Sequence, residues 1–301
     1  MATSGLAKTQ SDRPAPWVAA PELQTVAELL RFAPDTYLFR YEDYVSLFVV
    51  TDEGVILVDP NGGINPLGRG NPHAPSVLKE AIHSVTDQPV RYVIYSHAAP
   101  DHATGGVAFA DTARFVGHST TATFLSNRAD PATPSPEVTF TSRMTIELGG
   151  KAVELYHADL ALSGPARSYI IVHHSAARMV MFTDLARIET LPFGPFVHGH
   201  PDRTLDALEW IDEHLEFDFV VWGHASPRVI GTRNDLRSTR RYIFDLSAAI
   251  EAARTAGVND NSPEMLTWVR SELNPRYASW RFFDEFLEAN IEGMIRWRRA
   301  P

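Results

Sequence analysis

Histidine and aspartate side chains gather in one short segment, RYVIYSHAAPDHATGG, at residues 91–106. Residues 92–95 are rich in β-formers, so His97, Asp101 and His102 fall in the loop after a buried strand. Imidazole and carboxylate groups are the zinc ligands that remain when thiolates are absent, and the chain has no cysteine. The segment therefore predicts a metal site.

Length and composition limit the kinds of protein that could carry this site. The chain has 301 residues, of which 44% are hydrophobic, so it can bury a large core. The formal net charge of −10 argues against nucleic acid or an anionic membrane as partner and favours a small neutral or cationic substrate. We find no apolar run of about 18 residues and hence expect no membrane span.

The polar, proline-rich residues 1–20 are interpreted as a disordered tail without the apolar core of a signal peptide, which favours the cytoplasm. Helical spacing predicts a short amphipathic helix over residues 23–32. Strands with helices between them follow in two β-rich halves as far as residue 232. The proline-rich loop at residues 129–136 is interpreted as an insertion or a lid margin, since strand signals resume directly after it.

From Asn234 to the end, the pattern becomes helical and rich in apolar side chains. We expect two packed sheets with helices outside them over residues 21–232, followed by a helical extension over residues 233–301. The extension is predicted to pack on the sheets. A homodimer interface and a cover over the substrate channel are the alternatives.

The spacing His97-x-Ala99-x-Asp101-His102 resembles the His-x-His-x-Asp-His signature of the metallo-β-lactamase superfamily, with Ala99 in place of the second histidine. The resemblance covers residues 45–224, with the motifs in order. It implies an α+β fold, the αββα four-layer sandwich.

The resemblance assigns roles to residues at other strand ends. Asp59, after residues 55–58, would support the metal loop without binding metal. Asp184 follows a strand at 179–182, with Thr183 where the family has glycine, and would be a ligand. His224 matches a Gly-His motif after a late strand and would be another.

One family motif has lost its histidine. The matching segment is Ala161-Leu162-Ser163-Gly164, with Leu162 at the ligand position. His157, five residues earlier, could replace it if the loop is bent. The alternative is a structural histidine at a strand end.

Ala99 and Leu162 stand where the family has histidine ligands, and in a two-metal site of the family both histidines would bind the same metal. Their loss leaves the other metal with all its ligands, which suggests a site for one ion per chain. Nitrogen and carboxylate ligands suit Zn²⁺, and Mn²⁺ or Fe²⁺ is chemically compatible. The predicted ligands are Asp101, His102, Asp184 and His224.

This site predicts a hydrolase that uses a metal-activated water on a small, largely apolar molecule, a lactone, ester or amide. Hydrolytic dehalogenation of an aromatic is a less favoured interpretation. His97 would hydrogen-bond or shuttle a proton of the water, or alternatively orient a ligand. Phe193 and Phe196 could line the substrate pocket, or could be core residues. A non-catalytic metal- or ligand-binding protein on the same scaffold is the rival function.

Overall fold

The computed structural model describes residues 27–65, 68, 70–159, 168–192, 200–226, 228–260 and 262–299. The predicted tail at residues 1–20 lies outside these ranges. Within them, no helix combines the length and the low polarity that crossing a bilayer requires.

In the part of the chain that the structure describes, the first sheet contains seven strands in chain order. β1 to β4 pair antiparallel, whereas β4 to β7 pair parallel, so the last strands of this sheet end at one common edge. The strands are β1 (Ala27–Ala33), β2 (Thr36–Tyr41), β3 (Tyr44–Val50), β4 (Val55–Val58), β5 (Val90–Ile94), β6 (Arg114–His118) and β7 (Val138–Phe140).

The described residues form six strands in the second sheet, all antiparallel to their neighbours except the parallel pair β11 and β12. One pair, Tyr44 of β3 with His224 of β12, joins the two sheets. The strands are β8 (Arg143–Leu148), β9 (Lys151–His157), β10 (Ile170–His174), β11 (Met179–Met181), β12 (Phe219–Ser226) and β13 (Arg228–Thr232).

The two sheets pack face to face around a core of aliphatic side chains from both. Leu47 and Ile94 of the first sheet belong to the same buried cluster as Leu155, Val172 and Val221 of the second. Alternation along the strands sends the intervening side chains outward, where helices must cover them.

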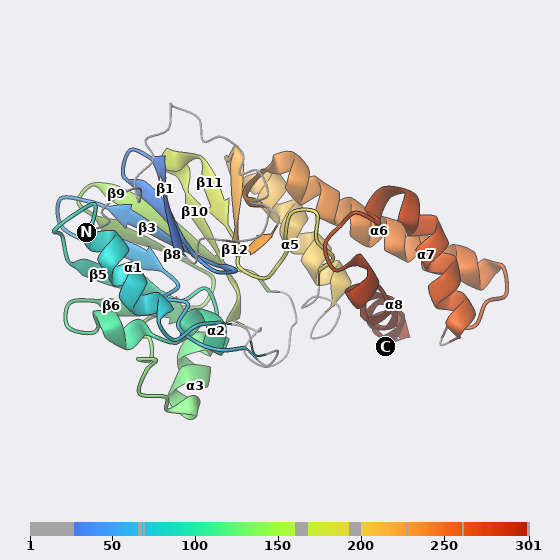
Figure 1. The fold of residues 1–301 in the computed structure, drawn as a ribbon, viewed down its shortest axis with the longest axis horizontal. Coiled ribbons are helices and arrows are strands. Elements are labelled where there is room, and N and C mark those ends of the chain that lie inside the picture. The colour runs from blue at the N-terminus through green and yellow to red at the C-terminus, as the bar shows by residue number, and fades with distance from the viewer. Residues whose placement is uncertain are drawn as a thin grey trace.

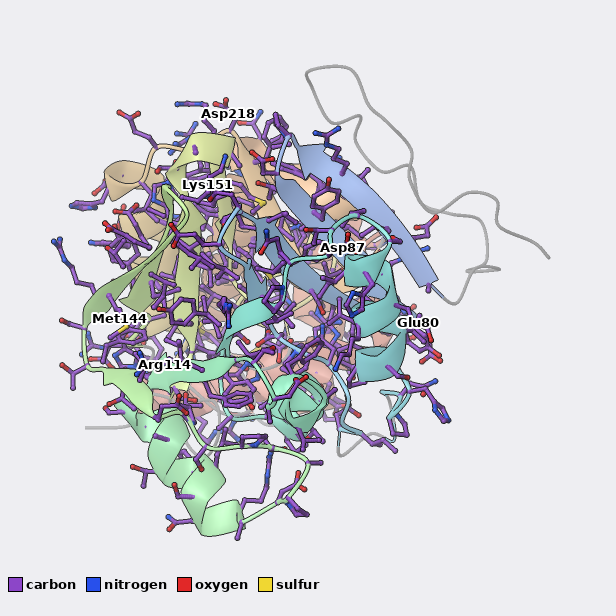
Figure 2. All side chains as sticks on the ribbon, turned by 90° about the vertical axis from the view of Figure 1, so that its left-hand side faces the viewer. Glu80, Asp87, Arg114, Met144, Lys151 and Asp218 are labelled. Carbon is purple, nitrogen blue, oxygen red and sulfur yellow. The ribbon has the colours of Figure 1, made fainter. Side chains whose placement is uncertain are left out.

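Helices cover both outer faces. Leu78 of α1 (Ala74–His83) and Leu125 of α3 (Ser119–Arg128) pack on the first sheet. On the second sheet lie α5 (Pro201–His214) and the start of α6 (Arg233–Thr255). Figure 2 shows α1, with Glu80, at the right and β8, the edge strand of the second sheet, with Met144, at the left. The predicted αββα sandwich is confirmed.

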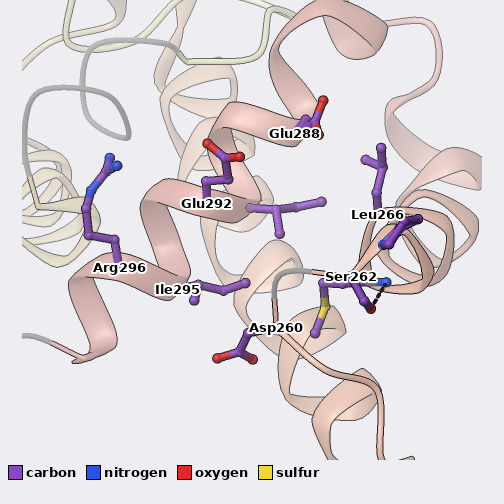
Figure 3. Close-up of a pocket in the computed structure, with 10 residues that line it drawn as sticks. Asp260, Ser262, Leu266, Glu288, Glu292, Ile295 and Arg296 are labelled. Atoms are coloured by element: carbon purple, nitrogen blue, oxygen red, sulfur yellow. Dashed lines mark hydrogen bonds between the residues drawn. The ribbon is translucent and has the colours of Figure 1, made fainter.

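The C-terminal helices α6, α7 (Pro263–Tyr277) and α8 (Phe283–Arg299) form a core of their own. They extend away from α1 and α3, and α6 connects them to the sandwich (Figure 1). α7 and α8 border a hollow of about 630 Å³, with Leu266 and Ile295 in its wall and Glu288 and Glu292 beside them (Figure 3).

The helix predicted over residues 23–32 is wrong for the part that the structure describes. Ala27–Ala33 is the strand β1, paired antiparallel with β2. A short apolar run satisfies helical and strand periods almost equally, so the hydrogen bonds that the edge of β2 offers decide between them.

Candidate metal centre

The predicted ligands come together where several strands end at one edge of the sandwich. β5 delivers His97, and the short helix α2 (Pro100–Ala103) presents Asp101 and His102. From the second sheet, Asp184 follows β11 and His224 lies within β12. Because β11 and β12 run parallel, their carboxyl ends bring Asp184 and His224 to the same place.

The carboxylate of Asp184 lies among three imidazoles. His224 Nε2 is 2.6 Å from Oδ1, while His97 Nε2 and His102 Nε2 are 3.4 and 3.5 Å from Oδ2. The Nε2 atoms of His102 and His224 are 3.0 Å apart. Three ring nitrogens thus point at one carboxylate, an arrangement typical of a metal-binding cluster.

Asp101 approaches the same point from α2. Its Oδ2 lies 3.6 Å from His102 Nε2 and accepts a hydrogen bond of 3.1 Å from Tyr44 Oη. The described residues include two groups whose donor atoms all lie within 4.8 Å of one another. They are His97, His102 and Asp184, and Asp101, His102 and His224.

A hydrogen-bond chain fixes the orientation of the buried His102 ring. Asn61 Nδ2 donates to Ser46 Oγ (2.9 Å), which itself donates to the Asp59 carbonyl (2.6 Å). The Asn61 Oδ1 atom is therefore left to accept from His102 Nδ1, at 3.1 Å. This places the proton on Nδ1 and directs the Nε2 lone pair into the cluster.

Asp59 lies behind the metal loop, fully buried. Its Oδ1 accepts from the Ser96 backbone N–H (2.8 Å), and its Oδ2 from Thr183 Oγ1 (3.3 Å). Asp59 and Asp184 have φ angles of 56° and 61°, a left-handed conformation that aspartate tolerates better than most residues. Asp59 thus connects the segments that carry His97 and Asp184.

Gly223 allows β12 to approach the segment before Asp184. A Cβ atom there would lie 2.3 Å from Thr183 Cγ2. The strand pairing between β12 and β13 also shifts register between Val221 and Ser226, around His224. Bulges of this kind redirect a side chain.

The charges and unpaired atoms of the cluster fit a divalent cation. Burial by itself would lower the pKa of His102, yet the carboxylates of Asp184 and Asp101 raise that pKa to about 9. His97 Nε2 is buried without a hydrogen-bond partner among the described residues. Surplus negative charge beside an unpaired imidazole nitrogen is what a bound cation satisfies.

The possible extra ligand His157 is not brought into the site. His157 stacks on His118 at a ring distance of 3.8 Å and belongs to neither potential ligand group. Leu162, Phe193 and Phe196 lie outside the described residues.

Tyr44 and Asn61 are site residues that the sequence analysis missed. Tyr44 opens β3, and its ring lies 4.6 Å from that of His224. Asn61 lies two residues after Asp59, and this position beside a predicted site residue is the signal by which the sequence could have indicated it. Nothing local to Tyr44 indicates that β3 meets β12.

The loop at residues 129–136, predicted to be an insertion or a lid margin, is hydrogen-bonded to the segments on either side of the metal loop. The Ala132 carbonyl accepts from the backbone N–H groups of Gly105 and Val107, and Tyr95 Oη donates to the Pro134 carbonyl. Arg128 Nη1 donates to the Ala98 carbonyl at 3.1 Å. This loop therefore supports the metal loop from outside the site.

A scan of the sequence against protein-family models gives no match, and a comparison with curated proteins gives none. Solved structures do match. A metallo-β-lactamase from Pontibacter korlensis superposes with a TM-score of 0.60 at 18% identity, covering 73% of this chain and 99% of that one. The DIM-1 metallo-β-lactamase gives 0.57 at 14% identity, covering 73% and 98%.

A stereoselective inverting sec-alkylsulfatase from Pseudomonas sp. gives a TM-score of 0.65 at 15% identity. It covers 91% of this chain, and this chain covers 50% of it. Residues 233–301 make up more than a fifth of the chain. Coverage of 91% therefore requires that most of the C-terminal helices are matched as well. The sheets, their order in the chain and these superpositions show that the chain has the metallo-β-lactamase fold.

Proposed function

We propose that the protein is a metal-dependent hydrolase with one divalent ion, Zn²⁺, held by Asp101, His102, Asp184 and His224. The observation that carries the proposal is the convergence of three imidazole Nε2 atoms on the Asp184 carboxylate. A bound cation would supply a Lewis acid and a more acidic water. The fold supports this function, because the solved structures that match it include hydrolases by name.

In this proposal His97 accepts and returns a proton at Nε2. Its Nδ1 faces Ser96 Oγ at 3.0 Å, which holds the ring with Nε2 toward Asp184. Tyr169 packs beside the His97 ring at 4.3 Å and limits the space available to it. A fixed imidazole with one unpaired nitrogen suits a general base.

For the substrate we propose a small, largely apolar lactone, ester or amide. The named activities of the matching structures add β-lactams and sec-alkyl sulfate esters to the compounds that merit testing. Halogenated aromatic compounds complete the set of candidate substrates that a hydrolysis screen should include.

Metal analysis of protein purified without added metal tests the proposal. We expect about one ion per chain in the wild type and in Asp218→Ala, a control at an exposed ion pair with Arg178. Asp184→Ala should lose the ion. Absence of metal from the wild type would favour a non-catalytic binding protein, and two ions per chain would contradict the single-metal proposal.

A further inference from the structure

The turn between α7 and α8 is fastened to the segment that follows Asp184. The Arg281 backbone N–H donates to the Glu189 carbonyl (2.8 Å), and the Leu191 N–H donates to the Arg281 carbonyl (3.1 Å). Thr190 and Arg281 form a parallel bridge. The C-terminal extension is thus joined to the chain only a few residues from the metal centre.

From this turn, the Arg281 side chain reaches the carboxylate of Asp43. Arg281 Nη1 lies 3.6 Å from Asp43 Oδ1, and Arg187 Nη1 lies 4.0 Å from Oδ2. Asp43 is therefore a carboxylate held between two guanidinium groups.

Asp43 also faces the back of the proposed ligand His224. Its Oδ2 is 3.6 Å from His224 Nδ1, the ring nitrogen opposite the one that points at Asp184. His224 Nδ1 and Asp43 Oδ1 are both buried, and neither has a hydrogen-bond partner among the described residues. A carboxylate behind a metal-binding imidazole fixes its tautomer and raises its basicity.

We propose that Arg281 is a positioning residue of the metal centre, which holds Asp43 in place behind His224. The helical extension thereby helps to determine how tightly the site binds its ion. This inference rests on the proposed function, since it requires His224 to be a ligand.

Zinc affinity, measured by competition with a chromophoric chelator, tests the inference. We expect Arg281→Ala to weaken binding about 10-fold, the lower end of the loss that follows removal of a group behind a metal ligand. Arg281→Lys keeps the charge and should recover most of the affinity. The matched control is Arg276→Ala, which removes an ion-paired arginine of the same extension, beside Asp245, and should leave affinity unchanged.

A second measurement separates positioning from a general loss of structure. In an Asp43→Asn background, Arg281→Ala should cause little further loss of zinc affinity, because the two residues act in one chain. Equal affinity of Arg281→Ala and Arg276→Ala would overturn the inference. Failure of the wild type to bind zinc would instead overturn the proposed function. If circular dichroism shows that Arg281→Ala does not fold, Arg281→Gln takes its place, and its zinc affinity is compared with that of Arg276→Ala in the same way.

Discussion

His97 is the residue whose role the geometry leaves most sharply divided. It lies in one of the two potential ligand groups, with His102 and Asp184, yet the proposed ligand set takes Asp101 and His102 from the same loop. A ligand and a general base would occupy nearly the same position here. Only metal content and turnover, measured together, separate the two roles.

We predict that His97→Ala keeps its metal and loses about 10²- to 10⁴-fold in turnover, the usual contribution of a general acid or base. Metal analysis and steady-state kinetics on a substrate from the screen measure the two quantities. His214→Ala is the control, since His214 is the last residue of α5 and stacks on Trp210. Loss of the ion from His97→Ala would make His97 a ligand.

At the level of the elements, the contact between β12 and the end of β11 sets the separation of Asp184 and His224. Thr183 fills the space that a side chain at position 223 would need, and it also donates to Asp59. Gly223 therefore leaves the room that Thr183 occupies at the position before Asp184.

We predict that Gly223→Ala lowers the free energy of unfolding by about 1–3 kcal/mol, the usual cost of overpacking. Thr183→Gly in the same chain should restore part of it, because it removes the clashing atoms. Urea denaturation of the two single variants and the double variant completes the cycle. Strictly additive losses would show that the two positions do not interact.

For the whole molecule, the metal centre is the place where the two sheets join. Among the described residues, the backbone pair that joins them is Tyr44 with His224, and both are site residues. Tyr44 donates to Asp101, and His224 contacts Asp184, so the connection between the sheets passes through the proposed ligands. Metal occupancy and the stability of the sandwich should therefore depend on each other.

We predict that removal of the metal with a chelator lowers the midpoint of thermal unfolding and that added zinc restores it. Without a cation the buried carboxylates of Asp59, Asp101 and Asp184 face the His102 imidazole and, at Asp184, the Arg187 guanidinium, and a bound divalent ion would add a stronger counter-charge. Free zinc at 100 times its dissociation constant would stabilise the native state by about 2.7 kcal/mol. Scanning calorimetry measures the shift. Asp184→Ala, which lacks the central carboxylate, should show no response to zinc.

The oligomeric state is a further property of the whole molecule. A homodimer through the C-terminal helices stays a prediction from their apolar composition. Light scattering after size exclusion would give the mass of the assembly relative to the 33.5 kDa chain.

Local patterns in the sequence were enough to identify most of the strands, though not β1 or β13, and to single out the candidate site residues near strand ends. The candidate site residues all lie at or shortly after the end of a short apolar run, and a signal of this kind depends on only a few neighbouring residues. These residues are Asp59, His97, Asp101, His102, Asp184 and His224. The fold class followed from the order of these signals and from the resemblance of the His97 loop to a known motif.

The tertiary structure decided everything that depends on contacts between distant parts of the chain. The pairing of Tyr44 with His224, the strand at Ala27–Ala33 and the approach of Arg281 to Asp43 all join segments that no local pattern relates. Strand pairing and side-chain contact are properties of the packed chain. The sequence alone therefore determined which groups could bind a metal, and only the fold decided which groups stand behind them.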